Sequence, residues 1–319
     1  MSGGSLVLRA EGLTKRFGRK VANDRIDLEV GQGRIFGFLG KNGAGKSTFV
    51  KMMVGLTEPT AGRAELLGRP LDDFRTRGRI GFLPENFRYQ EWLSPLELLA
   101  FHGRLKGMPA ADIHAASERV LADVGLAAES RNKIRSFSKG MQQRLGLACA
   151  MLGEPELLFL DEPTSALDPI GRHDVRELLV RERARGATVF LNSHLLSEIE
   201  LVCDEVAFLD SGRIVEAGLL SQLLGGRCEV DVELAAPFIP TLPEDGPRLL
   251  SAEARRLLVE VTGESEIPAL VGLLVEQGAR IVAVGRRQRS LESLFLETVG
   301  DTAHEQPTPA EESRGVAHG

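Results

Sequence analysis

The chain has 319 residues, of which 43% are hydrophobic, and it carries a formal net charge of −6 at pH 7. This length allows one large domain and a smaller one, and the acidic balance argues against a nucleic-acid-binding surface, which requires a basic excess. The three cysteines, Cys149, Cys203 and Cys228, are widely spaced with no C-x-x-C, which fits a reducing cytosol and argues against a disulfide framework or a zinc site.

No segment of the sequence is expected to direct secretion or to cross a membrane. Residues 1–5 lack the charged and apolar regions of a signal peptide. The longest apolar runs, 145–153 and 269–275, are much shorter than the ~18 residues that a membrane-spanning helix needs. If the protein serves a membrane process, we therefore expect another chain to cross the membrane.

The N-terminal residues 6–13 alternate between apolar and polar side chains, which predicts a strand. Phe17 follows, shortly before the glycine-rich motif described next. An aromatic ring at this place can stack on a purine base. Alternatively, Phe17 is only the hydrophobic end of the strand.

Residues 40–48, GKNGAGKST, match the phosphate-binding pattern G-x-x-x-x-G-K-[S/T]. A buried strand is predicted before the motif and a helix after it, which is the context that the pattern requires. The glycines allow successive N–H groups to point at an anion, and the helix start adds the positive end of its dipole. Lys46 would lie between the β- and γ-phosphates, and the Ser47 hydroxyl would bind Mg²⁺. The predicted nucleotide-binding residues of this motif are Gly40, Lys41, Asn42, Gly43, Ala44, Gly45, Lys46, Ser47 and Thr48.

Residues 63–68 and 80–84 predict two short strands. The stretch 85–93 then contains the only Trp and the only Tyr of the chain, Trp92 and Tyr89. An aromatic cluster in a loop indicates either a binding surface or a small local core, and the sequence does not decide between them.

Helices dominate the next part of the chain. Ser94, followed by proline and then by glutamate three residues on, has the pattern of a helix N-terminus. Residues 110–126 predict an amphipathic helix. The segment 136–144 precedes an apolar helix that ends near Leu152.

Residues 157–160 predict a fully buried strand that ends in Asp161 and Glu162, a Walker B pattern. Asp161 would hold Mg²⁺ through its water shell, and Glu162 would polarise the attacking water. His194 follows the next strand, 188–191. Because ligands of open α/β sheets bind at the carboxyl ends of strands, the shared location predicts a catalytic role for His194.

The composition changes near residue 225. The predicted domains are an ATPase domain over 1–224, an α+β appendage over 225–300 and a disordered tail over 301–319, which is rich in Pro, Glu, Ala and Gly. The appendage contains no chemical motif of its own. Its predicted elements are strands at 229–234, 256–261 and 281–284 and helices at 264–277 and 290–299.

These motifs together resemble the ATPase subunit of an ABC transporter over about residues 6–224. The motifs occur in the family's order. Phe17 matches the A-loop, 40–48 Walker A, Glu85 the Q-loop, 137–141 the ABC signature, 157–162 Walker B, 165–168 the D-loop and His194 the H-loop switch.

Two positions depart from the family pattern. The signature is F-S-K-G-M instead of L-S-G-G-Q, but it keeps Ser138 and Gly140, which in the family face the γ-phosphate of the partner's ATP. This form, and the segment 290–296, resemble the ABC-2 type exporter branch. Glu85 stands where the family has Gln; it can still contact Mg²⁺ or water, and Gln90 is too far along the chain to replace it.

The resemblance implies an α/β P-loop NTPase fold of the ABC cassette type. This fold has a RecA-like mixed-sheet core, an antiparallel β subdomain and an α-helical signature subdomain, here followed by a small C-terminal α+β appendage. It also implies ATP and Mg²⁺ as ligands, with Lys46, Glu162 and His194 catalytic and Ser47, Asp161 and Glu85 at the metal.

The implied assembly is a head-to-tail pair of ATPase subunits, identical or closely related, at the cytoplasmic face of the membrane. A separate transmembrane permease would be gripped by the loop 85–105, and Asp168 would pass contacts across the dimer interface. No nucleic-acid partner is expected. Two alternatives are a soluble ABC ATPase acting on ribosomes or DNA, and a nucleotide-gated module without catalysis. The single cassette and acidic pI argue against the first, and Glu162 and His194 against the second.

Overall fold

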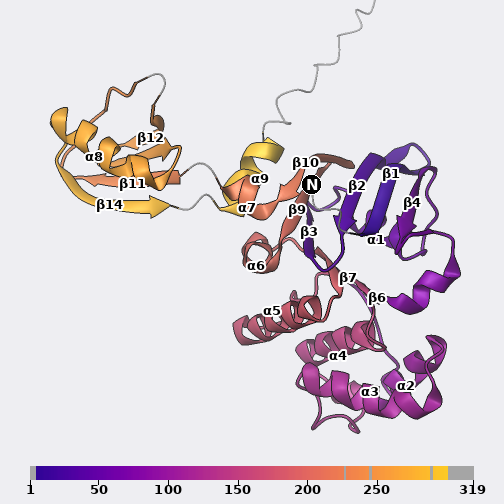
Figure 1. Ribbon diagram of the computed structural model, residues 1–319. Coiled ribbons are helices and arrows are strands. Elements are labelled where there is room, and N and C mark those ends of the chain that lie inside the picture. The colour runs from indigo at the N-terminus through magenta and orange to yellow at the C-terminus, as the bar shows by residue number, and fades with distance from the viewer. Residues whose placement is uncertain (1–4, 226–227, 244–245, 288–289, 301–319) are drawn as a thin grey trace, which may run out of the picture.

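The computed structural model describes residues 5–225, 228–243, 246–287 and 290–300 (Figure 1). A six-stranded sheet with the order β10-β9-β3-β8-β7-β6 forms the core of the large unit. β3 and β6 to β9 run parallel, so their carboxyl ends meet at one edge of the sheet, and β10 pairs antiparallel with β9. The strands are β3 (Ile35–Gly40), β6 (Ile80–Leu83), β7 (Leu157–Asp161), β8 (Thr188–Asn192), β9 (Glu205–Asp210) and β10 (Arg213–Leu219).

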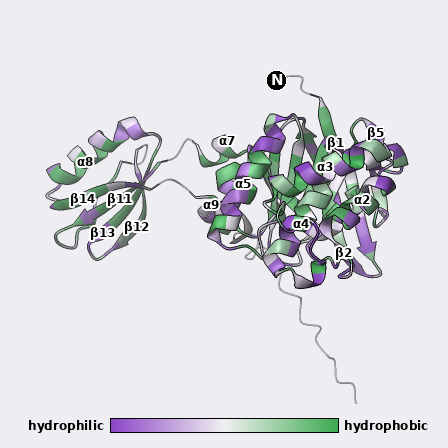
Figure 2. Cartoon of the chain, turned by 90° about the horizontal axis from the view of Figure 1, so that it is seen from below, coloured by the Kyte–Doolittle hydropathy of each residue, from purple (hydrophilic) through white to green (hydrophobic). Residues whose placement is uncertain are grey.

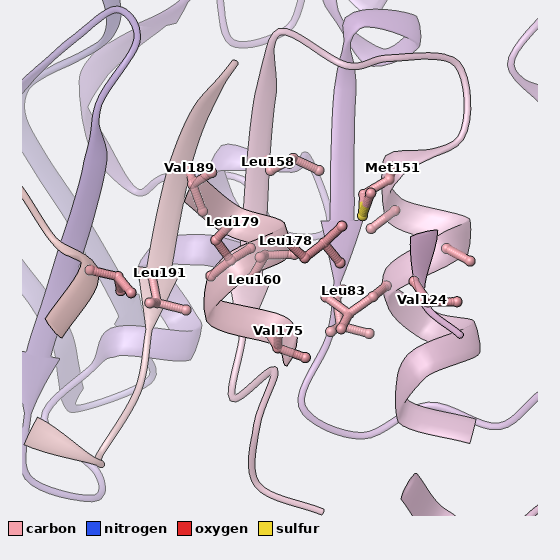
Figure 3. Close-up of a cluster of buried hydrophobic side chains, with 14 of the residues drawn as sticks. Leu83, Val124, Met151, Leu158, Leu160, Val175, Leu178, Leu179, Val189 and Leu191 are labelled. Atoms are coloured by element: carbon pink, nitrogen blue, oxygen red, sulfur yellow. The ribbon is translucent and has the colours of Figure 1, made fainter. Parts of the chain in front are cut away.

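The parallel strands are buried on both faces, which explains why they are apolar at nearly every position. Leu158 and Leu160 of β7 point toward the side covered by α4 and α5, whereas Phe159 points to the opposite side. The buried side chains on the α4 and α5 side of the sheet form the first hydrophobic core. Figure 3 shows this first core, where side chains of β7 and β8 meet Val175 and Leu178 of α5.

A second, antiparallel sheet has the order β2-β1-β4-β5. Its strands are β1 (Leu6–Phe17), β2 (Lys20–Gly31), β4 (Ala61–Leu66) and β5 (Arg69–Pro70). Together with α1 it encloses the second core, in which the Phe190 ring lies 5.3–5.8 Å from four other phenylalanine rings. Ring contacts of this kind add to the stabilisation from burial and hold α1, with the loop before it, against β3.

Helices α2, α3 and α4 form a subdomain beside β6 (Figure 1). The predicted helix start at Ser94 is confirmed as a capping box: the Ser94 hydroxyl accepts from the Glu97 amide at 3.3 Å, and the Glu97 carboxylate accepts from the Ser94 amide at 2.7 Å. The helices of the large unit are α1 (Lys46–Met53), α2 (Pro95–Leu105), α3 (Ala110–Asp123), α4 (Lys139–Met151), α5 (Pro169–Ala184), α6 (Leu196–Val202) and α7 (Leu220–Leu224). Short 3₁₀ segments occur at Phe74–Arg79 and Ile134–Ser136.

The C-terminal part forms a small unit of its own, separate from the large unit in two views (Figures 1 and 2). It is a four-stranded antiparallel sheet, β12-β13-β11-β14, with α8 packed on one face around a separate hydrophobic core. Its elements are β11 (Cys228–Leu234), β12 (Arg248–Glu253), β13 (Arg256–Val261), a 3₁₀ turn (Glu264–Glu266), α8 (Ile267–Glu276) and β14 (Ile281–Arg287).

The last helix, α9 (Leu291–Gly300), packs on the large unit and not on this small sheet. Leu291 and Leu294 are buried in the first core, and the Phe295 ring lies 5.8 Å from the Phe208 ring. The sequence pattern placed this helix in the appendage at 225–300. Nothing in the sequence before the helix indicates that the chain returns to the large unit. The predicted disordered tail, 301–319, lies outside the described residues.

The described residues thus contain the expected mixed-sheet core, antiparallel subdomain and helical subdomain. None of the helices in this part of the chain is both long enough and apolar enough to cross a membrane.

Candidate functional site

The phosphate-binding loop connects β3 to α1 at the carboxyl edge of the sheet. Gly45 caps α1 with φ 111°, a backbone conformation that only glycine adopts readily. A Cβ at Gly45 would collide with the Ala22 carbonyl oxygen, and one at Gly40 with that of Leu209. The glycines therefore allow both the turn and its close packing against neighbouring strands.

Lys46 opens α1 and is only 8% exposed. Its ammonium donates to the carbonyl oxygens of Gly40 at 2.6 Å and Lys41 at 3.2 Å, so it lies across the loop. Burial lowers the pKa of Lys46, and the carboxylates of Glu162, Asp161 and Glu85 oppose that shift. A phosphate bound in the loop would stabilise the charged form further.

Asp161 ends β7 and is held from two sides. The Asn192 side-chain amide, from the end of β8, donates to its carboxylate, and the Ser47 hydroxyl hydrogen-bonds to it. Burial raises the pKa of Asp161 above its usual range, and the charges of Glu85 and Glu162 add to the shift, whereas the hydrogen bonds from Ser47 and Asn192 oppose it. The site thus disfavours a lone negative charge.

These groups fit a magnesium ion. The Ser47 hydroxyl and Asp161 carboxylate are hard oxygen ligands of the type that Mg²⁺ prefers. Asn192 Oδ1 is buried and has no hydrogen-bond partner among the described residues, and Asn192 lines the same cavity. An unsatisfied buried oxygen beside a carboxylate indicates a place for a hydrated cation.

Glu162 and His194 form the second pair of the site. The Glu162 Oε1 accepts the His194 backbone N–H at 2.9 Å and lies 2.8 Å from His194 Nδ1. The Ser193 hydroxyl reaches Glu162 Oε2 at 3.5 Å. These contacts fix the carboxylate at the cavity wall, where it can act as a base toward a water molecule.

One cavity of about 590 Å³ brings most of the predicted residues together. From the predicted set it is lined by Phe17, Asn42, Gly43, Gly45, Lys46, Ser47, Thr48, Glu85, Asp161, Glu162 and His194. Gly40, Lys41 and Ala44 belong to the loop but do not line it. Ser138 and Gly140 do not line it either, and their predicted role in nucleotide binding must involve another site.

Phe17 lies at the end of β1, at the mouth of the cavity. Its ring is 53% exposed, and the Lys15 ammonium lies 4.9 Å from the ring centroid. An exposed ring at a cavity mouth is available to stack on a base, whereas a purely structural strand end would be covered.

Several residues at or beside the site were not predicted to belong to it. Asn192, Lys20 and Ala22 line the cavity, and so does Ser165, which the sequence placed only in the D-loop. Gln143 supports the cavity from α4. Asn192 had a usable signal, because it is the polar residue that closes the apolar strand β8. The sequence gives no comparable signal for Gln143, because the hydrogen-bond partners of a glutamine in a helix depend on the tertiary structure.

Residues 23–165 match the ABC transporter family. An ABC transporter ATP-binding protein of Synechocystis sp. is 36% identical over 276 residues, which are 85% of this chain and 76% of that protein. The chain belongs to the ABC transporter ATP-binding proteins. The Nod factor export ATP-binding protein I of Ralstonia nicotianae is 34% identical over 311 residues, which are 93% of this ABC protein and 95% of that one.

The ABC fold is confirmed by solved structures. The ATP-binding subunit of an ABC transporter superposes with a TM-score of 0.64 at 30% identity, over 68% of this chain and 91% of that one. The aligned fraction of this ABC protein is close to the size of its large unit.

We expect Gly45→Ala to weaken ATP binding at least about tenfold, because the added methyl group combines positive-φ strain with a collision against Ala22. Isothermal titration with ATP measures the change. Gly12→Ala is the matched control: Gly12 has φ 57° but no atom near the added Cβ, so ATP affinity should stay at the wild-type value. Wild-type affinity in Gly45→Ala would contradict the assignment of the loop.

Proposed function

We propose that this ABC protein hydrolyses ATP and drives a separate membrane-spanning permease, as one subunit of an exporter. The observation that carries the proposal is the contact of Glu162 with His194 at the wall of the cavity that also holds Lys46 and Asp161. This arrangement puts a base, a phosphate-binding cation and a metal-binding carboxylate around one substrate.

In this proposal Glu162 takes a proton from the water that attacks the γ-phosphate, and His194 holds the γ-phosphate and orients that water. Lys46 leaves its carbonyl partners and binds the β- and γ-phosphates. Phe17 stacks on the base.

Ser47 and Asp161 would hold the Mg²⁺ that accompanies ATP, with Glu85 beside them. When bound, the ion neutralises charge on the phosphates. Glu85 in place of glutamine adds a negative charge to this side of the cavity, and this charge adds to the rise in the pKa of Asp161 that burial causes.

A second copy or a close relative of the chain would complete each site. Ser138 caps α4 by accepting the Met141 amide at 3.2 Å, so the signature presents the N-terminus of a thirteen-residue helix, a favourable place for a phosphate. Because Ser138 and Gly140 lie outside the chain's own cavity, they are available to the ATP of a partner. Closure of the pair would then depend on the γ-phosphate.

The export direction and the location at the cytoplasmic face of the membrane rest on the relatives and on the signature form. One relative carries Nod factor export in its name, and the alignment with it includes most of the C-terminal unit. Cargo would be chosen by the permease.

We expect Glu162→Gln to keep ATP binding but to lower kcat by about 10²- to 10⁴-fold, because the amide cannot accept the proton from water. Steady-state phosphate release and nucleotide binding measure the two properties. Glu177→Gln, the same change at an exposed position of α5, should keep wild-type turnover. Turnover near wild type in Glu162→Gln would refute the role of the base.

The aromatic side chains of the stretch 85–93 lie partly in the core and partly on the surface. Phe87 and Tyr89 pack against the first core with their ring centroids 5.0 Å apart, whereas the Trp92 indole is 71% exposed. Trp92 precedes α2 in the helical subdomain, within the loop expected to grip the permease. A large exposed aromatic side chain of this kind is a typical anchor of an interface.

We expect Trp92→Ala to reduce transport driven by the assembled exporter at least tenfold while the ATPase activity of the isolated subunit stays near wild type. Leu201→Ala, which truncates another exposed apolar side chain on α6, serves as the control for general surface effects. Equal loss of both activities in Trp92→Ala would count against a docking role.

A further inference from the structure

We infer that Gln143 is a positioning residue that ties the signature helix to the backbone of Glu162 and so couples two nucleotide sites. The inference rests on the proposed function, because it assigns the signature to one ATP and Glu162 to the other. It concerns a side chain that touches neither nucleotide.

Gln143 lies on α4, five residues after Ser138, and is only 5% exposed. Its Nε2 donates to the carbonyl oxygen of Glu162 at 3.1 Å and to that of Pro163 at 3.0 Å. A side-chain amide has two N–H donors, so both are used on adjacent peptide groups of one turn. A buried side chain with this pairing is costly to move without breaking both bonds.

The backbone that Gln143 holds needs external support. Glu162 has φ 54°, a conformation that is unfavourable for a residue with a side chain, and Pro163 after it has no N–H to donate. The Glu162 amide also donates to the Asn192 carbonyl at 2.8 Å, and the Glu162 carbonyl also accepts from the Ser165 hydroxyl at 3.1 Å and from the Ser165 amide at 3.4 Å. Among these supports of the Glu162 backbone, Gln143 alone comes from the signature helix.

Ser138 and Gln143 both lie in the N-terminal half of α4, so one short rigid segment connects them. The N-terminus of α4 carries Ser138, which in the proposed dimer faces the partner's ATP, and its side chain at Gln143 holds the base that acts on the chain's own ATP. A shift of the helix caused by binding at one site would therefore move the Glu162 carboxylate at the other. Misplacement of a reacting group by about 1 Å can cost on the order of 100-fold in rate.

The test is Gln143→Met, which keeps the length of the side chain and removes both donors. We expect kcat to fall about 10- to 100-fold, the apparent KM for ATP to change less than about threefold, and the Hill coefficient for ATP to approach one. Hydrogen exchange in residues 161–168 should accelerate at least about tenfold without nucleotide, while α4 itself stays protected. If Gln143→Met does not fold, Gln143→Asn retains the amide but cannot reach both carbonyls.

Leu147→Ala is the matched control, because it removes packing from the same helix and leaves both hydrogen bonds in place. It should lower the melting temperature but keep kcat within about twofold and leave exchange at 161–168 unchanged. A role of Gln143 in stability alone would give the two variants the same pattern, and that result would overturn the inference.

Wild-type kcat in Gln143→Met, or unchanged exchange at 161–168, would overturn it as well. The exchange measurement needs no hydrolysis. Absence of ATPase activity in the wild-type protein with its permease would therefore remove the proposed function, while the exchange result still decides whether Gln143 holds the segment.

Discussion

The pairing of β8 with both β7 and β3 is the constraint on which the site depends. On one side Asp161 pairs with Asn192, and the Glu162 amide extends the contact by donating to the Asn192 carbonyl at 2.8 Å. On the other side Phe38 pairs with the same Asn192, which places the end of β3 and the phosphate-binding loop next to it. Because His194 follows β8 directly, one strand register sets the positions of the Glu162 carboxylate, the His194 imidazole and the loop. A slip by a single residue would separate all three.

The electrostatics of the cavity favour joint binding of phosphate and metal. Burial lowers the pKa of Lys46 and raises the pKa of Asp161, because desolvation destabilises the charged form of each group. Phosphate oxygens near Lys46 and a cation near Asp161 would each favour the charged form of the neighbouring side chain. This is a physical reason for a site of this kind to bind ATP together with Mg²⁺ and to bind either one poorly alone.

Local sequence signals predicted the parts of the molecule where one strong pattern decides the structure. The loop at 40–48, the apolar strand ending at Asp161 and the capping box at Ser94 were all predicted, because glycine conformations, two-sided burial and helix capping act over a few residues. β2 was not predicted. Its buried residues Ile26, Leu28 and Val30 alternate with polar residues as in any strand, but the charged residues around them obscure this pattern in the sequence. The positive φ of Arg25 also makes the strand irregular.

Other features depend on contacts between distant segments and could not be predicted locally. The return of α9 to the large unit rests on the packing of Phe295 against Phe208, nearly ninety positions apart in the sequence. The support of Glu162 by Gln143 likewise exists only because α4 packs beside the end of β7. In the aromatic stretch after Glu85, composition predicted a cluster, but only the fold separates the packed Tyr89 from the exposed Trp92.

In the proposed dimer, two chains share each ATP, with the signature of one placed over the phosphate-binding loop of the other. Cysteine cross-linking of Ser138→Cys with Asn42→Cys, in the Glu162→Gln background, tests this most directly, because Asn42 lines the cavity, Ser138 does not, and the native cysteines Cys149, Cys203 and Cys228 are buried. The account predicts a covalent dimer that forms with ATP and not without it. Binding of ATP with no covalent dimer at any nucleotide concentration would contradict the account.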